Sequence, residues 1–158
     1  MKRPNSYTSQ YSIGEAARKL KISVETIRLY ERSGLILFVK TKGNQRLVDQ
    51  ADIDRIICIR QAINEHKISI GGIRRMQSMV PCWDYVSCSE DQRKKCPAYQ
   101  RPDAGCWTYN HTRNDCAGTN CRQCDVYQLS GDCQKIKSLI HHTTVRAETR
   151  RRSRGTTS

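Results

Sequence analysis

Cysteine is the residue type in this sequence that could carry chemistry. Nine cysteines occur among 158 residues, and eight of them lie between residues 82 and 133. The order Cys-Trp, Cys, Cys-x-x-Tyr occurs twice, which indicates an internal repeat of about 25 residues. The first copy holds Cys82-Trp83, Cys88 and Cys96-Pro97-Ala98-Tyr99, and the second holds Cys106-Trp107, Cys116 and Cys124-Asp125-Val126-Tyr127.

Residues 81–133, the cysteine segment, have few aliphatic side chains and cannot assemble much of a hydrophobic core, so we expect a bound metal to order them. Cys121-x-x-Cys124 has the close spacing common to zinc and iron–sulfur sites, whereas the other gaps fit no zinc-finger pattern. Cys58 is isolated and is not counted. The predicted metal ligands are Cys82, Cys88, Cys96, Cys106, Cys116, Cys121, Cys124 and Cys133.

All-thiolate ligation is expected because His111 is the single histidine inside the segment. Thiolates suit either Zn²⁺ or an iron–sulfur cluster, and the sequence leaves these two open. An iron–sulfur cluster could respond to redox state, whereas zinc would only fold the segment. Disulfides or free thiols are a third interpretation.

Charge divides the chain into three parts. The formal net charge of +13 consists of +8 in residues 1–80, −1 in residues 81–133 and +6 in residues 134–158. The two basic ends are therefore expected to meet a polyanion. No apolar run approaches the roughly 20 residues of a membrane span, and no signal peptide is apparent, so we expect a cytoplasmic protein without membrane contact. In that compartment clustered cysteines are more often metal ligands than disulfides.

Two short helices are predicted near the start of the chain, after a flexible leader over residues 1–10. Ser12 and Glu15 have capping-box spacing, so the first helix should begin at Ile13. Ser23 caps a second helix, which Gly34 ends. This pattern is typical of a helix-turn-helix, whose second helix enters the major groove of DNA.

A β-hairpin wing should follow. The segment from Leu35 to Val39 is predicted as a strand, Gly43-Asn44 supply residues that tolerate positive φ, and Leu47-Val48 begin the return strand.

Two further helices complete the expected domain over residues 11–80. Asp49 and Asp52 open the first, and Ser69 caps the second, which runs from Ile70 to Met79 before Pro81. An apolar stripe on the first of these helices should pack onto the helix-turn-helix, and it consists of Ile53, Ile56, Ile57 and Ile63.

Three sequence blocks resemble, in order and spacing, the DNA-binding domain of the MerR family. They are Tyr11-Ser12-Ile13-Gly14-Glu15-Ala16-Ala17, residues 26–36 (TIRLYERSGLI), and Asn44-Gln45-Arg46-Leu47 with residues 52–56 (DIDRI). Residues 67–75 are most similar to the branch that contains the heat-shock and glutamine-synthetase repressors. Leu29 stands where the family usually has a second aromatic residue, and the long dimerisation helix has no obvious counterpart. The cysteine repeat resembles one attached to various bacterial signalling proteins.

The resemblance implies that Val24, Glu25 and Arg28 face the groove, that Tyr30 lies near the sugar-phosphate backbone, and that Arg46 holds the wing on phosphate. An arginine guanidinium can donate two hydrogen bonds at once to a guanine edge or to a phosphate, whereas the other basic side chains mainly supply charge that positions the protein on DNA. The predicted DNA-contacting residues are Arg18, Ser23, Val24, Glu25, Thr26, Arg28, Tyr30, Lys40, Lys42, Asn44 and Arg46.

The expected fold is therefore mainly α: a winged helix-turn-helix with a β-hairpin wing, then a small irregular metal-stabilised segment, then a short helix and a basic disordered tail over residues 134–158. The function expected from it is a homodimeric bacterial transcription regulator that binds a palindromic operator and responds to metal, redox state or cluster occupancy. RNA polymerase is a further candidate partner. The alternative is an architectural, excisionase-like DNA-binding module with a purely structural zinc site. No catalytic constellation or cofactor fingerprint suggests an enzyme.

Overall fold

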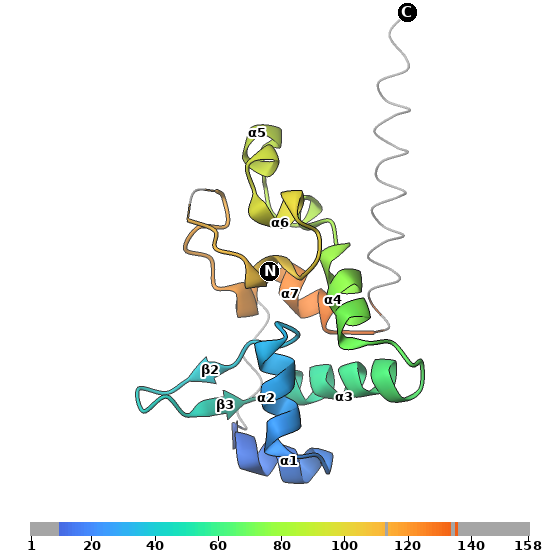
Figure 1. Ribbon diagram of the computed structural model, residues 1–158. Helices are drawn as coiled ribbons and strands as arrows, with labels where there is room; N and C mark the ends of the chain where they lie inside the picture. The colour runs from blue at the N-terminus through green and yellow to red at the C-terminus, as the bar shows by residue number, and fades with distance from the viewer. Residues whose placement is uncertain (1–9, 113, 134, 136–158) are drawn as a thin grey trace, which may run out of the picture. The chain divides into compact units, whose positions relative to one another are not determined.

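The computed structural model describes residues 10–112, 114–133 and 135 (Figure 1). The chain divides into two compact units, which we call the winged-helix unit (residues 1–74) and the cysteine unit (residues 75–158), and we describe each by itself. The predicted leader before Gln10, and the predicted helix and basic tail beyond Lys135, lie outside the described residues. Of the helices described, none has the length and apolar character needed to cross a membrane.

The helix-turn-helix consists of α1 (Ile13–Leu20) and α2 (Val24–Arg32). The capping box at the start of α1 is confirmed: the Glu15 backbone N–H donates to Ser12 Oγ at 3.3 Å, and the Ser12 N–H donates to Glu15 Oε2 at 2.7 Å. These bonds, first from the Ser12 backbone, lower the pKa of Glu15. Lys21 takes the left-handed conformation (φ 53°), which turns the chain toward α2.

The end of α2 is also as expected. Gly34 has φ 73°, a conformation that glycine adopts without a Cβ penalty, and the Leu35 N–H donates back to the Tyr30 carbonyl at 3.0 Å. The chain then turns inward, so Leu35 and Ile36 are fully buried. The predicted strand from Leu35 is therefore wrong in its bounds, because these two side chains anchor an extended connection inside the core.

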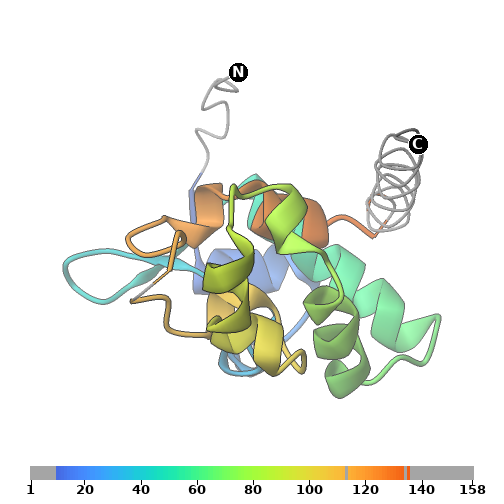
Figure 2. The same cartoon turned by 90° about the horizontal axis from the view of Figure 1, so that it is seen from above.

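The wing is formed by β2 (Val39–Lys40) and β3 (Arg46–Val48), which pair antiparallel and project from the helices (Figure 2). Asn44 supplies the positive φ of the turn (59°), whereas Gly43 does not take one. A short strand that the sequence did not predict, β1 (Tyr11–Ser12), pairs with the other edge of β3, giving the order β1-β3-β2. This pairing connects the wing to the start of α1.

The helix α3 (Gln50–Asn64) begins at the predicted Asp49–Asp52 capping box. Ile53 and Ile56 are buried, but Ile57 is 42% exposed, so its place in the apolar stripe was wrong. At 100° per residue Ile57 lies just beyond one edge of the buried face, whereas Ile59 falls within that face. The next helix, α4 (Ile70–Ser78), begins where predicted, with the Gly72 N–H donating to Ser69 Oγ at 3.0 Å, and extends across the division between the units.

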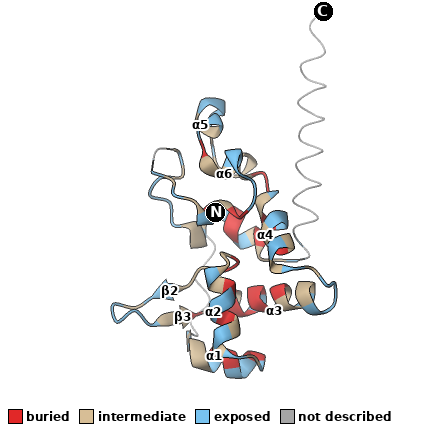
Figure 3. Ribbon diagram, viewed as in Figure 1, coloured by how far each residue is buried: buried red, intermediate tan, exposed pale blue. Residues whose placement is uncertain are grey.

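The core of the winged-helix unit lies where α1, α2 and α3 meet, and Figure 3 shows buried residues along the facing sides of these helices. A buried arginine, Arg55, donates from Nε to the Leu35 carbonyl at 2.8 Å, which fixes the inward-turning connection. The buried members of the core are Ala16, Ala17, Leu20, Ile27, Tyr30, Leu35, Ile36, Val48, Ile53, Ile56, Ile59 and Ile73.

The cysteine unit contains only short helices after α4. They are the 3₁₀ helix η1 (Cys82–Asp84), α5 (Glu90–Lys94), α6 (Pro97–Gln100), the 3₁₀ helices η2 (Cys106–Thr108) and η3 (Cys121–Gln123), and α7 (Asp125–Ser130). Its apolar cluster has Val80 and Val126 as buried members, with cysteine and tyrosine side chains packed against them. The segment predicted as irregular is thus a series of helical turns around a very small core.

Candidate functional site

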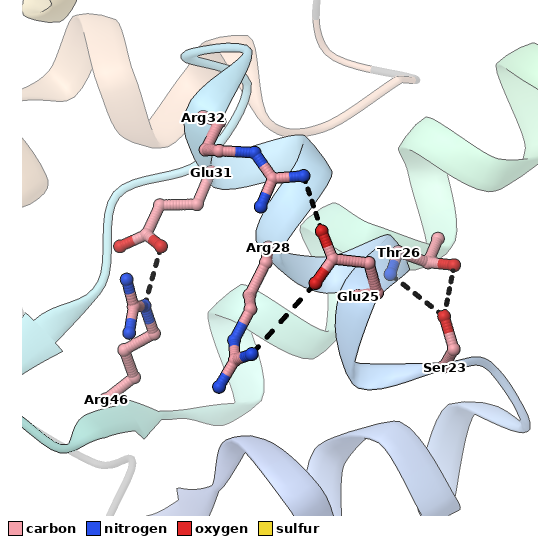
Figure 4. A network of polar contacts seen from close by, with 7 residues as sticks. All are labelled: Ser23, Glu25, Thr26, Arg28, Glu31, Arg32 and Arg46. Carbon is pink, nitrogen blue, oxygen red and sulfur yellow. Dashed lines mark hydrogen bonds and ion pairs between the residues drawn. The ribbon is translucent and has the colours of Figure 1, made fainter.

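Helix α2 presents a row of polar side chains on its exposed face (Figure 4). Ser23 Oγ accepts the Thr26 N–H at 3.0 Å, so Ser23 is engaged as the helix cap. Glu25 forms an ion pair with Arg32 at 2.6 Å and lies 4.0 Å from Arg28. These pairs hold two guanidinium groups over the same face of α2.

Arg28 keeps 48% of its side chain exposed, and its 4.0 Å approach to Glu25 is a loose one. Surface ion pairs of this kind contribute little energy, so Arg28 can exchange its partner for another acceptor at small cost. Its planar fork matches the edge of guanine or a phosphate. Val24 and Thr26 are partly buried beside it.

The wing supplies further cations. Lys40, Lys42 and Asn44 are exposed on the hairpin, and Arg18 is exposed on α1. Tyr30, by contrast, is only 5% exposed, and burial raises the pKa of its hydroxyl. The expectation that Tyr30 lies against the sugar-phosphate backbone is therefore corrected: its ring belongs to the core.

Arg46 has a role that the sequence did not suggest. Its Nε donates to Glu31 Oε2 at 2.6 Å, with 26% and 17% of the two side chains exposed, so the pair ties β3 to α2 (Figure 4). Arg46 was predicted to hold the wing on phosphate, and the structure gives it a protein partner that aligns the wing with α2. Glu31 was missed because it is distant in sequence and looks like a solvated charge.

The two copies of the cysteine repeat have matching local structures. Each Cys-Trp pair begins a 3₁₀ helix, and each later cysteine, Cys96 or Cys124, stands at the N-cap of a short α-helix. In the first copy Trp83 meets Tyr99 edge to face at 5.4 Å, and in the second Trp107 meets Tyr127 in the same way at 5.0 Å. These aromatic pairs serve packing.

Five of the predicted ligand cysteines line a small cavity of about 20 Å³. A water molecule needs about 10–15 Å³ by this measure, so the space is too small for an organic ligand. We call this space the thiol cavity. Its lining residues are Cys82, Val86, Cys106, Trp107, His111, Cys116, Thr119, Cys121, Cys124, Val126 and Tyr127.

Burial, together with the charges of neighbouring cysteines, raises the pKa of four cavity thiols, Cys82, Cys106, Cys116 and Cys121. Burial, followed by the charges of Cys116, Cys96 and Cys88, raises the pKa of Cys82 to about 11. The pKa of Cys116 is also raised to about 11, by burial and then by Cys124, Cys96, Cys88 and Cys121.

Burial and neighbouring negative charges also raise the pKa of three further thiols, Cys88, Cys106 and Cys121. The pKa of Cys106 rises strongly, through burial and then the charges of Cys82, Cys124, Cys116 and Cys121. Burial also raises the pKa of Cys88 and Cys121. A bound cation would favour the thiolate forms that repel one another here.

Two polar side chains fix the thiol-bearing segments. His111 Nε2 donates to the Cys106 carbonyl at 2.6 Å, so in the neutral ring Nδ1 is an acceptor, and Asn114 Nδ2 lies 2.9 Å from it. Asn114 also donates to Cys96 Sγ at 3.5 Å and accepts the Cys116 N–H at 3.1 Å. Asn114, which sequence reasoning missed, therefore connects Cys96 of the first repeat to Cys116 of the second.

The predicted ligands do not all join this group. Cys82, Cys88, Cys96, Cys106, Cys116, Cys121 and Cys124 are free thiols. Cys133 is disulfide-bonded, as is Cys58, so the sulfur of Cys133 is not available as a thiolate and we remove it from the candidate set. Within the described ranges no three histidine, cysteine, aspartate or glutamate side chains already form a group that could hold a metal ion, so the thiols would have to move together to bind one.

Comparison with known proteins finds similarities for the first part of the chain. Residues 11–80 match the model of the MerR HTH family regulatory protein. Over 83 residues, 52% of this chain, the sequence is 31% identical to the HTH-type transcriptional regulator ZntR of Escherichia coli, in strains K12 and O157:H7. The matched region covers 58% of the length of those relatives. No solved structure matches the chain significantly.

Proposed function

We propose that this chain, with its MerR-type helix-turn-helix domain at residues 11–80, is a DNA-binding transcription regulator whose cysteine segment holds a thiophilic metal. The observation that carries the proposal is the exposed face of α2, where Arg28 stands beside a capped helix start in a domain of this kind. The similarity to a named transcriptional regulator over the same region supports it.

In this function α2 is the helix that enters the major groove. Arg28 reads a base edge or a phosphate, and Lys40, Lys42 and Arg18 provide positioning charge. The ion pair between Arg46 and Glu31 keeps the wing aligned with α2, so that both reach DNA together. A homodimer on a palindromic operator is the arrangement we propose, because two copies of a helix-turn-helix read two half-sites about one helical turn apart.

The thiols of the cysteine unit fit a thiophilic metal by their donor chemistry. Seven free thiols are present, five of them line the thiol cavity, and His111 has both ring nitrogens engaged. The bound metal would supply cross-links between the short helices, and an iron–sulfur cluster would add a redox response. Such a regulator would work in the cytoplasm, where most cysteines are reduced, and the disulfide-bonded Cys58 and Cys133 are the exceptions in this chain.

Binding to duplex DNA at several salt concentrations tests the DNA half of the proposal. We expect affinity to fall steeply with salt, because each phosphate contact releases counterions. Selection from fragmented genomic DNA would supply the operator. Absent or salt-insensitive binding to every duplex would overturn this half of the proposal.

Protein purified without oxygen tests the metal half. We expect zinc or iron in the preparation, and brown colour would identify an iron–sulfur cluster. The alternative function, an architectural module with structural zinc, would be favoured by strong DNA bending and by binding that does not change when the metal is removed. Promoter-specific binding that changes with metal content favours the regulator.

A further inference from the structure

We propose that Arg60, in the second half of α3, is a positioning residue for DNA recognition. Together with Arg55 of the same helix it holds the backbone at the two ends of α2, and so fixes the orientation in which α2 meets a base pair. This inference rests on the DNA-binding half of the proposed function and adds the residues that align the reading helix. Neither arginine was among the predicted DNA-contacting residues.

The backbone just before α2 is held by Arg60. Its Nη1 donates to the Leu20 carbonyl at 2.9 Å, across 40 residues of sequence. Leu20 is the last residue of α1, and the final carbonyls of a helix have no donor within that helix. The C-terminal end of a helix also carries partial negative charge, which favours a cation there. Arg60 therefore fixes the end of α1 and the turn from Lys21 to Ser23 that leads into α2.

The backbone just after α2 is held in the same way by Arg55. Its Nε donates to the Leu35 carbonyl at 2.8 Å, and Arg55 is only 4% exposed. Leu35 follows the left-handed Gly34, so this bond fixes the point where the chain leaves α2 for the wing. One helix thus binds a backbone carbonyl on either side of α2.

The spacing of the two arginines along α3 suits this arrangement. They are five residues apart, which is about 7.5 Å along the helix axis at 1.5 Å per residue. At 100° per residue their side chains leave α3 about 140° apart, so one side chain can reach each end of α2.

These two bonds supply a direction that the apolar core does not. The buried face of α2 packs through Ile27 and Tyr30. Apolar contact depends on the area buried and has no preferred direction, so a helix held by it alone can rotate or slide by a small amount. Hydrogen bonds weaken steeply when they bend. A bond at each end of α2 therefore limits both movements.

Base reading by Arg28 depends on this alignment. Arg28 lies between the two anchored ends of α2, and a paired contact with guanine requires both of its donors to meet acceptor atoms at hydrogen-bond distance. Attraction to phosphate is independent of sequence and tolerates displacement better. Loss of the Arg60 bond should therefore reduce the preference for one sequence more than the attraction to DNA in general.

The test compares the affinity of the full-length chain for two duplexes. One is the tightest-binding fragment selected from genomic DNA, and the other has the same base composition in scrambled order. Arg60→Met keeps an apolar stem and loses the donors. We expect its affinity for the selected fragment to fall about tenfold, the effect of losing a hydrogen bond that involves a charged group, with a much smaller change for the scrambled duplex.

Two further variants sharpen the comparison. Arg60→Lys keeps the charge and a donor for the Leu20 carbonyl, so it should recover most of the preference for the selected fragment. Lys42→Met removes an exposed cation of the wing, so it should weaken both duplexes alike and reduce the dependence of affinity on salt. Arg60→Met should leave the salt dependence nearly unchanged, because its guanidinium is bound to protein backbone.

A purely structural role for Arg60 would lower the temperature of unfolding and leave the ratio of the two affinities unchanged. The ratio is therefore measured at a temperature where circular dichroism shows each variant to be folded. Because Arg60→Met could fail to fold, NMR of the arginine guanidinium groups in the unchanged protein provides a second measurement. The Arg60 signals should exchange slowly with water and keep their positions when the selected duplex is added, whereas those of Arg28 should shift.

An unchanged affinity ratio in folded Arg60→Met would overturn the inference. Arg60 signals that shift with those of Arg28 on addition of duplex would also overturn it, since Arg60 would then contact DNA itself. If the unchanged protein binds no duplex, the DNA half of the proposed function fails as well, so the two failures are distinguishable.

Discussion

The two units bury very different side chains. The winged-helix unit encloses a cluster of mainly aliphatic residues from its helices, from β3 and from the connection after α2, and Figure 3 shows buried residues in α2 and α3. In the cysteine unit the buried members of the apolar cluster are Val80 and Val126, and thiols occupy positions where aliphatic residues would otherwise stand. Burial of apolar area therefore orders the winged-helix unit, whereas in the function proposed above a bound metal orders the cysteine unit.

This contrast has energetic consequences. Each large aliphatic side chain buried in the winged-helix unit contributes about 1.5–3 kcal/mol, so stability there is spread over many residues. A structural zinc ion binds with about 10–16 kcal/mol at neutral pH, which concentrates the stability of a small domain in a few bonds. The winged-helix unit should therefore tolerate single changes that the cysteine unit does not.

Metal removal should have the largest effect. We expect a strong chelator, or acid that returns protons to the thiols, to unfold residues 81–133 and leave residues 11–74 folded. Acid should release the metal because the pKa of Cys82 and of Cys116 is raised to about 11. Thiols with such a high pKa bind protons readily, so protons displace the metal from the sulfur atoms as the pH falls. Limited proteolysis with mass spectrometry would locate the new cleavage sites.

Replacing Cys121 and Cys124 together by serine should produce the same local cleavage without a chelator. A metal-free protein in which residues 81–133 still resist protease would show that the cysteine unit is ordered without metal. Disulfide bonds would then be the favoured explanation for the order of residues 81–133.

A cavity in the winged-helix unit should have the next largest effect. Ile56 is fully buried at the centre of α3, so Ile56→Ala should destabilise this unit by about 2–5 kcal/mol. Hydrogen exchange of α1 to α3 would measure the loss. Ile57→Ala is the matched control on the same helix, since Ile57 is 42% exposed and should change stability by less than about 1 kcal/mol. Equal effects of the two changes would mean that the buried face of α3 has been misplaced.

Much of the winged-helix unit could be predicted from sequence because its signals are local. Caps at Ser12, Ser23 and Asp49 lie within three residues of their partners, and Gly34 ends α2 through its own backbone preference. The features that sequence reasoning missed depend on distant contacts. Strand β1 exists because β3 provides an edge, and the pairing of Arg46 with Glu31 joins residues that only the fold brings together.

The spatial grouping of the thiols in the cysteine unit could not be predicted from the sequence. Repeat spacing identified which thiols belong together in sequence, but Cys116 lies among thiols of both repeats. Its placement depends on Asn114, and an asparagine in a loop has no sequence signal that separates it from ordinary turn residues. Disulfide bonding of Cys133 likewise could not be read from spacing.

DNA recognition offers a further way to separate the units. Arg28→Ala should weaken operator binding by about 1–3 kcal/mol if the guanidinium reads a base edge, without changing metal content. Arg28→Lys distinguishes a base contact from a phosphate contact. Lysine keeps the positive charge that attracts phosphate but cannot donate the paired hydrogen bonds that a guanidinium makes to a base edge. Lys94→Ala, an exposed cation of the cysteine unit, is the control and should leave affinity nearly unchanged. Normal operator affinity in Arg28→Ala, measured by fluorescence anisotropy, would mean that α2 is not the reading helix.

The smallest predicted effect concerns the cap of α3. Asp49 accepts the Asp52 N–H at 2.9 Å, and Asp52 Oδ2 accepts the Asp49 N–H at 3.1 Å, where Asp52 is only 2% exposed. Asp49→Ala leaves a buried backbone donor without its carboxylate acceptor, so the winged-helix unit should lose about 1 kcal/mol, within the range of about 0.5–2 kcal/mol for caps. Asp54→Ala removes the same charge from an exposed position of α3, where the carboxylate accepts from Gln50, and should cost less. Denaturant unfolding followed by hydrogen exchange would rank the two. Because the cap acts only through its own helix, zinc content should be equal in both variants, and a fall in metal binding in Asp49→Ala would show that the two units do not reach order independently.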